Sequence, residues 1–362
     1  MKKTFSLLFA LIMVLCTLTA AQAETVNLND YTLDEIIAKA QEIGDIQSVG
    51  MPDDWANWGE TWSDILETYG ITHSDIDMSS GEELALFEAE SAAGTKDIGD
   101  VGQSYAPVAV EMDVVQSYKP TTWDSIPDFA KLDDDGNCIM AYYGTICFIT
   151  NTSLVDTPPT SWADILEGDY KICIGDVTVG ASSQCSVLSA ALAFGGSEAD
   201  VQPGIDFFIE LAEAGRIDPG DASTARLEKG EIAVMVTWDY LALQRRDTIL
   251  ANNPDMSFDI HIPSDGAIQS GYTTVLNKYA PNPWGAALAR EYIFSDAGQI
   301  NLARGYAKPV RDVELPTELA EAMIPDEQYA NARFIEDYDA WTESVAYMSQ
   351  EWEEEVIPSL PQ

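Results

Sequence analysis

Trp238, Asp239 and Tyr240 end the stretch IAVMVTWDY, directly after six residues typical of a buried strand. An indole, a carboxylate and a phenol in this place can provide a catalytic acid, a set of metal ligands or the wall of a binding pocket. The structural alternative is that Trp238 covers the core and Asp239 caps the helix that follows. We expect a pocket wall, in which the indole packs on the apolar or cationic part of a ligand and the carboxylate accepts from an amine or hydroxyl.

Two predicted helix starts carry small and hydroxyl residues, at residues 79–81 (SSG) and 180–183 (GASS). The first N–H groups of a helix have no intrahelical partner, and the helix dipole makes them favourable to anions. Ordinary N-capping explains most such sequences. Both of these starts, however, lie on loops beside predicted strands, where open α/β sheets bind ligands. Together with Trp238 and Asp239, they predict a pocket for a small polar molecule.

Enzyme motifs are absent where they would be easiest to see. The two histidines, His73 and His261, lie in no H-E-x-x-H motif, and the sequence has no G-x-S-x-G, Walker A or dinucleotide-binding motif. Paired carboxylates such as Asp176 and Asp239 leave an exported hydrolase as an alternative. We expect no enzymatic activity, no cofactor and no bound metal. A purely structural surface protein is a third alternative.

The N-terminus has the features of a secretory signal peptide. A pair of lysines precedes an apolar run from Phe5 to Leu18 and an A-x-A cleavage site, so we expect cleavage after Ala23. Cys16 lacks the small preceding residue that lipidation requires, which favours a soluble exported protein over a lipid-anchored one. The expected location is the periplasm.

The composition of the chain argues against nucleic acid and anionic membranes as binding partners. The sequence has 61 acidic and 18 basic residues and a net charge of −43, and such a surface repels nucleic acid and anionic lipid. Hydrophobic residues make up 46% of the chain, which is ample material for a core. A chain of 362 residues is longer than one that usually folds around a single hydrophobic core, so two lobes are predicted. We expect a monomer that does not insert into the membrane.

Four cysteines remain after the predicted cleavage: Cys138, Cys147, Cys173 and Cys185. Their even number and the export signal permit two disulfides, whereas their apolar surroundings are equally consistent with buried free thiols. Their spacings match no zinc pattern.

Helical and strand patterns alternate along the chain. Helices are predicted at residues 33–43 and 62–69, from Ser79 onward, and over SSQCSVLSAALAF and IDFFIELAEAG; strands are predicted over DIGDVG, YKICIGDV and IAVMVTW. This alternation favours α/β lobes with largely parallel sheets. Two longer predicted strands, Ala141 to Thr150 and Gln269 to Lys278, indicate a chain that crosses twice between two lobes.

Seven motifs follow one another in a characteristic order: SSGEELALFEAE, DIGDVGQSYAPVAVE, YYGTICFITN, PTSWADILEGDYKICIGD, LEKGEIAVMVTWDY, SGYTTVLNK and YIFSDAGQINLARGYAKPVR. Their order and spacing resemble the type II periplasmic solute-binding proteins of ABC importers. This broad group contains ferric-ion, polyamine, thiamine, phosphonate and sugar-phosphate receptors. The resemblance covers essentially the whole mature chain.

The resemblance implies an α/β fold of two lobes, joined by two crossover strands, with the ligand cleft between the lobes. Residues 24–147 and 264–362 are expected to form the first lobe and residues 148–263 the second. Ligand binding would close the lobes by a hinge motion, and the closed form would dock on membrane permease subunits.

The resemblance also implies a set of ligand-binding residues, to which we add Asp176, one of the paired carboxylates. They are Trp55, Ser80, Gly81, Gly102, Gln103, Tyr143, Thr145, Asp176, Gly180, Ala181, Ser182, Trp238, Asp239 and Tyr272. Ferric-ion receptors of the group use adjacent tyrosines near the place of Trp238, whereas the tyrosine pair of this chain falls on the first crossover strand. A hard ferric ion needs several anionic oxygens, so iron is disfavoured.

The expected solute is therefore small and polar, and anionic or zwitterionic. A phosphate, phosphonate or carboxylate would lie at the helix starts, and a donor group would face Asp239. A ferric-ion or polyamine receptor of the same fold remains an alternative.

Overall fold

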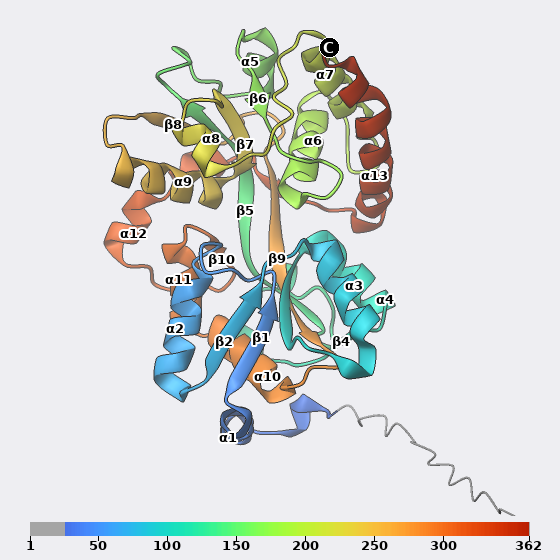
Figure 1. The fold of residues 1–362 in the computed structure, drawn as a ribbon, viewed down its shortest axis with the longest axis vertical. Helices are drawn as coiled ribbons and strands as arrows, with labels where there is room; N and C mark the ends of the chain where they lie inside the picture. The colour runs from blue at the N-terminus through green and yellow to red at the C-terminus, as the bar shows by residue number, and fades with distance from the viewer. Residues whose placement is uncertain (1–25, 362) are drawn as a thin grey trace, which may run out of the picture.

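A computed structural model describes residues 26–361, and the predicted signal peptide with its cleavage site after Ala23 lies outside them. Figure 1 shows two groups of helices and strands, one above the other, joined by the long strands β5 and β9. We call the lower group, which holds β1 to β3, the first lobe and the upper group, which holds β6 and β7, the second lobe. Within the described residues, no helix combines the length and hydropathy needed to cross a membrane.

One continuous path of paired strands links the lobes in the order β2-β1-β3-β9-β5-β7-β6. Pairing is parallel among β1, β2 and β3 and between β6 and β7, and antiparallel wherever β5 or β9 takes part in the path. The strands are β1 (Asp45–Val49), β2 (Thr72–Ile76), β3 (Ile98–Gly102), β4 (Val115–Gln116), β5 (Cys138–Asn151), β6 (Ile172–Cys173), β7 (Val234–Trp238), β8 (Phe258–His261), β9 (Ile268–Asn277), β10 (Lys308–Pro309) and β11 (Arg333–Phe334). The predicted crossovers thus lie on β5 and β9.

Helices cover the sheet of each lobe (Figure 1). Those of the first lobe are α1 (Leu33–Ile43), α2 (Trp58–Tyr69), α3 (Ser80–Glu90), α4 (Ala106–Glu111), α10 (Pro283–Ile293) and α11 (Asp296–Arg304). Those of the second lobe are α5 (Trp162–Glu167), α6 (Ala181–Ala193), α7 (Gln202–Glu213), α8 (Thr224–Glu228), α9 (Asp239–Asn252) and α13 (Tyr338–Glu351), whereas α12 (Thr317–Ala322) lies beside the junction.

Local sequence signals set the helix ends. A capping box between Thr32 and Glu35 starts α1, and Gly44 and Gly70 end α1 and α2 in the left-handed conformation. The predicted second helix begins earlier than expected, at Trp58, because Trp58 and Trp62 both face the core.

The end of the chain lies against the second lobe, which corrects the expectation that residues 264–362 all belong to the first. Ser344 Oγ donates to the carbonyl of Glu198 at 2.6 Å, and the rings of Phe208 and Trp352 are 5.3 Å apart. The turn after α13 packs its apolar residue Trp352 against α7, while α13 itself bonds to the residue Glu198 before α7. The chain therefore passes between the lobes three times, on β5, on β9 and over the segment from β10 to β11.

Arg290 is a fully buried cation on α10. Its guanidinium donates to four carbonyls, those of Tyr118 (3.0 Å), Gly136 (2.8 Å), Asn137 (3.1 Å) and Thr274 (2.7 Å). Burial lowers the pKa of Arg290 to about 10, which still leaves it charged at neutral pH. Arg290 thus joins α10, β9 and the loop before β5 within the first lobe.

Of the two alternatives for the cysteines, disulfides or buried free thiols, the structure shows buried free thiols. All four described cysteines are free and buried. Burial raises the pKa of Cys138 and of Cys185 to about 12, so these thiols stay protonated.

Candidate functional site

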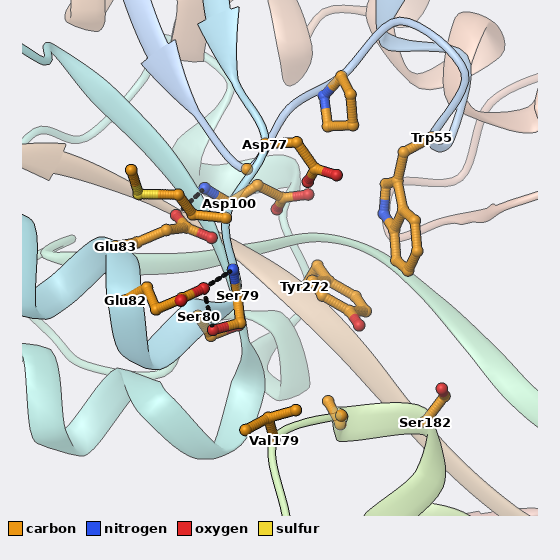
Figure 2. Close-up of a pocket in the computed structure, with 15 residues that line it drawn as sticks. Trp55, Asp77, Ser79, Ser80, Glu82, Glu83, Asp100, Val179, Ser182 and Tyr272 are labelled. Atoms are coloured by element: carbon orange, nitrogen blue, oxygen red, sulfur yellow. Dashed lines mark hydrogen bonds between the residues drawn. The ribbon is translucent and has the colours of Figure 1, made fainter. Parts of the chain in front are cut away.

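A cavity of about 450 Å³ lies between the lobes, near the carboxyl ends of β1, β2 and β3. Its first-lobe side consists of the loop after β1, the turn before α3 and Asp100 of β3. Its second-lobe side is the start of α6, and Tyr272 of β9 lies between the two sides (Figure 2). This is the position at which parallel α/β sheets present loops and helix N-termini to a ligand.

Two buried carboxyl groups form the base of the cavity. Glu83 is 0% exposed and Asp100 is 2% exposed, and the backbone N–H of Asp100 donates to Glu83 Oε2 at 3.2 Å. A Cβ at Gly50 would overlap Glu83 Oε1, and one at Gly99 would lie 2.6 Å from Oε2. Gly50 also has φ of +69°. Glycine is therefore required at both positions for the backbone to close over this side chain.

Each of the two carboxyl groups keeps one oxygen without a partner. Asp100 Oδ2 accepts from Tyr142 OH at 2.5 Å and from Trp58 Nε1 at 3.3 Å. Within the described residues, Asp100 Oδ1 and Glu83 Oε1 are buried and accept no hydrogen bond. Burial raises the pKa of Asp100 to about 8 and the pKa of Glu83 well above its usual value. Without a cation nearby, burial therefore disfavours the ionised form of both groups.

Aromatic rings form a wall beside these acids. The rings of Trp55 and Tyr272 are 5.3 Å apart at 70°, and those of Tyr142 and Tyr272 are stacked 5.6 Å apart. Trp55 Nε1 donates to Tyr142 OH at 2.6 Å, and this hydroxyl in turn donates to Asp100. The hydrogen-bond chain fixes the indole relative to the buried carboxyl group.

The two helix starts differ in charge. At the start of α3, Glu82 accepts from the N–H of Ser79 at 3.0 Å, and Glu82 and Glu83 are both acids of the first turn. The start of α6 has no side-chain cap and no acid in its first turn. Its first N–H groups therefore keep the positive end of the dipole open to the cavity, and Ser182 lies there (Figure 2).

Six of the predicted site residues line this cavity: Trp55, Ser80, Gly180, Ala181, Ser182 and Tyr272. Two more lie next to it. The N–H of Gly102 donates to Ser80 Oγ at 2.9 Å, and a Cβ at Gly102 would lie 3.6 Å from Ala181 Cβ, whereas Gly81 faces the ring of Tyr105. The structure thus brings together both predicted helix starts.

Three predicted residues point elsewhere. Gln103 lines a separate hollow beside α4, and Asp176 is exposed and accepts from the N–H of Thr178 at 2.8 Å. Tyr143 packs on Phe334, with ring centroids 5.1 Å apart, because neighbouring residues of a strand face opposite sides. The tyrosine on the cavity side of β5 is Tyr142, which the sequence prediction did not include.

Trp238 and Asp239 also lie outside the cavity lining. Asp239 is 1% exposed, and its carboxylate accepts from the N–H groups of Thr145 (3.0 Å) and Tyr240 (2.9 Å) and from Tyr329 OH (2.8 Å). Thr145 is likewise buried, and its hydroxyl accepts from Gln269 at 3.2 Å. Asp239 therefore starts α9 and ties β5 to the third passage between the lobes. Trp238 is buried in the core.

The prediction missed the acids of the cavity: Asp77, Glu82, Glu83 and Asp100. Asp77 and Glu82 are exposed at the rim, whereas Glu83 and Asp100 form the base. The available signal was Asp100 itself, a carboxyl group inside the otherwise apolar strand IGDVG. Among the residues that the structure describes, no three His, Cys, Asp or Glu side chains are arranged to hold a metal ion.

We expect the free energy of unfolding to fall by about 2 kcal/mol between pH 6.5 and pH 8. Burial raises the pKa of Asp97 to about 7 and that of Asp100 to about 8, from 3.8. The folded chain therefore keeps protons that the unfolded chain has released, and this stability is lost as the pH rises through the folded pKa values. Burial lowers the pKa of His73 to about 4, which opposes the trend only below pH 6.5. Urea unfolding at three pH values tests this; constant or rising stability would contradict it.

Comparison with known proteins gives a family match. Residues 94–339 match the family model described as bacterial extracellular solute-binding protein. No curated protein sequence matches the chain.

Solved structures share the fold over nearly their whole length. The periplasmic binding protein P5PA has a TM-score of 0.70 and 15% identity, over 86% of this chain and 99% of that one. AfuA from Actinobacillus pleuropneumoniae, with exogenous fructose-6-phosphate bound, has a TM-score of 0.66 and 17% identity, over 86% and 98%. The Atu4243-GABA receptor has a TM-score of 0.65 and 18% identity, over 85% and 96%. These similarities confirm the predicted two-lobe α/β fold.

Proposed function

The chain belongs to the bacterial extracellular solute-binding protein family, whose members act as receptors for ABC importers, and we propose that its solute is a small zwitterionic amine. The observation that carries this proposal is the lining of the cavity. Of the described residues that line it, four are carboxylic acids and none is lysine or arginine. The ammonium end of the solute lies on the first-lobe side, against Asp100 and the rings of Trp55 and Tyr272. Desolvated cations are attracted both by carboxylates and by aromatic faces.

The opposite side of the cavity supports an anionic end on the same molecule. The start of α6 presents N–H groups without a cap or a first-turn acid, and it lies across the cavity from Glu83 and Asp100 (Figure 2). A carboxylate there meets the positive end of a helix dipole, whereas a second ammonium meets repulsion. This favours a zwitterion over a diamine.

The residues that line the cavity also argue against phosphate or a phosphonate as the solute. We expected both helix starts to hold an anion, but Glu82 and Glu83 already occupy the first turn of α3. Two solved relatives of the fold are named for different solutes, fructose-6-phosphate and GABA, so the fold itself selects neither. The acidic lining supports the amine. The hydrolase alternative loses its basis, because Asp176 lies at the surface and Asp239 is buried with its oxygens engaged.

The proposed transport role involves a hinge between the lobes. The solute can contact the acids of the first lobe and the start of α6 at the same time only when the lobes are close together. It therefore binds the closed arrangement more tightly and favours it. Val179, at the rim on the second-lobe side, is 57% exposed and would be covered on closure. The closed form is the one that we propose to dock on the permease subunits.

Three solutes of similar length but different charge test the proposal: 4-aminobutyrate, 1,4-diaminobutane and glutarate. Native mass spectrometry of the purified protein first shows whether it carries a solute, which is then removed by unfolding and refolding. We expect a thermal-shift assay to show stabilisation by the zwitterion, at about 2.7 kcal/mol when its concentration is a hundred times Kd. Stabilisation by glutarate or by inorganic phosphate, without stabilisation by any amine, would contradict the proposal. So would turnover of the solute.

A further inference from the structure

We propose that the base of the cavity is a seat for a primary ammonium group, formed by Glu83 Oε1 and Asp100 Oδ1, which discriminates against quaternary ammonium. This inference rests on the proposed function and goes beyond it, because it states which kind of amine the receptor takes. We call these two carboxyl groups, with Gly50 and Gly99 that enclose Glu83, the ammonium seat.

The geometry of the seat defines the donor that it needs. One oxygen of each carboxyl group is occupied inside the protein, by the N–H of Asp100 on Glu83 and by Tyr142 and Trp58 on Asp100. The other oxygen of each is buried beside the cavity and accepts no hydrogen bond within the described residues. A buried acceptor without a donor is costly. Two free acceptors therefore call for a ligand group that carries at least two N–H donors.

A primary ammonium group meets this requirement and a quaternary one does not. The three N–H bonds of R–NH₃⁺ supply one donor for each of the two oxygens and leave one bond for the cavity. A trimethylammonium group carries the same charge, but its methyl groups would cover both oxygens without donating to either. Because Gly50 and Gly99 bring the backbone against Glu83, there is little room for those methyl groups at this end. A site that recognised only positive charge would bind both ligands. A site that requires two N–H donors binds only the primary ammonium.

The surroundings of the seat are acidic or neutral on every side. The titratable groups whose charges act on Glu83 and Asp100 are Asp75 of β2, Asp77 of the following loop, and Tyr142 of β5, and the phenols of Tyr240 and Tyr272 complete the surroundings. No lysine or arginine lines the described cavity. The only charge that can neutralise the ionised seat is therefore the charge of the ligand.

Binding to the seat exchanges a proton for the ammonium group. In the empty cavity, the carboxyl groups hold protons because burial disfavours their charged forms. The arriving R–NH₃⁺ keeps its own three protons, each carboxylic acid that accepts from it becomes a carboxylate, and the released protons pass to the buffer. No bond of the ligand is broken. Below pH 8, affinity should rise with pH by up to tenfold per unit for each proton released.

The test compares amines with their trimethyl counterparts by isothermal titration calorimetry at pH 7. The pairs are 4-aminobutyrate, glycine and ethanolamine, each against its N,N,N-trimethyl derivative, titrated in PIPES and in HEPES buffer, neither of which contains a primary amine or a phosphate. These two buffers differ in ionisation enthalpy, so the difference in heat counts the protons released. We expect at least one primary amine to bind tenfold or more tightly than its partner and to release one or two protons.

Two variants separate the seat from a general effect of charge. In Glu83→Gln, the preference for the primary amine should fall by about tenfold and proton release should decrease. Glu88→Gln, on an exposed position of the same helix α3, should leave both unchanged. Circular dichroism confirms folding, and Asp100→Asn serves as the second seat variant if Glu83→Gln is unfolded.

The outcomes are distinguishable. Equal affinity of a primary amine and its trimethyl partner, or binding without proton release, would overturn the seat while leaving the amine receptor intact. Binding of glutarate or phosphate in place of every amine would overturn the proposed function and the seat together.

Discussion

Replacing Asp100 by Asn should weaken binding of the amine solute by about 1.5–3 kcal/mol, which corresponds to roughly tenfold to a hundredfold in Kd. Asn keeps the size of the side chain, and its oxygen can still accept from Tyr142 and Trp58. The change removes the negative charge and places an amide N–H₂ where the cavity offers a free carboxylate oxygen. An ammonium ligand then meets a donor in place of an acceptor.

The same substitution should stabilise the empty protein at pH 8, by roughly 1–3 kcal/mol. Asp100 is 2% exposed and its pKa is raised to about 8 by burial, so its ionised form is unfavourable in the folded chain. Asn cannot ionise and avoids that cost. Calorimetric titration and urea unfolding at pH 8 measure the two effects side by side. Asp255→Asn, at an exposed position of the second lobe, is the control and should change neither.

A loss of stability together with a loss of binding would contradict this account, because it would make Asp100 a structural residue. A carboxyl group that is unfavourable for the fold and required for the ligand is expected at a functional site.

Arg290→Met should lower the free energy of unfolding by about 3–5 kcal/mol. The methionine fills much of the same volume, but it donates no hydrogen bonds to the four carbonyls that the guanidinium joins. Carbonyls buried without donors cost free energy, and the loop before β5 would lose its link to α10. Urea unfolding followed by tryptophan fluorescence measures the change.

Arg246→Met provides the matched control. Arg246 pairs at 2.8 Å with its neighbour Asp247, whose side chain is 44% exposed. A pair of this kind contributes about 0–1 kcal/mol, so the control should remain close to the unmodified protein. An Arg290→Met protein within 1 kcal/mol of the control would contradict the role assigned to Arg290.

The sequence was sufficient for the architecture. The two crossover strands are long runs of β-branched and aromatic residues between regions of helical periodicity, and they were predicted on the segments that became β5 and β9. Both helix starts were also predicted next to the cavity. What remained undetermined was the end of the chain, because the periodicity of α13 shows that one face is apolar but not which lobe that face covers.

The chemistry of the site was harder to predict, for physical reasons that particular residues illustrate. Tyr142 and Tyr143 are adjacent on a strand with protein on both sides, so no alternation of polar and apolar residues marks the face of each. Glu83 looked like an ordinary first-turn acid, since only the fold brings Gly50 and Gly99 against it. Asp239 does not form the pocket wall, because it is the first residue of α9 and its carboxylate accepts from Tyr329 of the third passage between the lobes.

The third passage between the lobes limits the mechanics of the receptor. Two adjacent strands such as β5 and β9 behave as a single flexible axis, about which two rigid bodies can swing through a wide arc. The segment from β10 to β11 also joins the lobes. Because Tyr329 bonds to Asp239 and Ser344 bonds to Glu198, we expect this part of the chain to act as a tether. A tether removes rotational freedom from the open state before any solute arrives. We therefore expect the entropy lost on closure to be smaller by that amount, so that a weakly held, small solute would be enough to bring the lobes together.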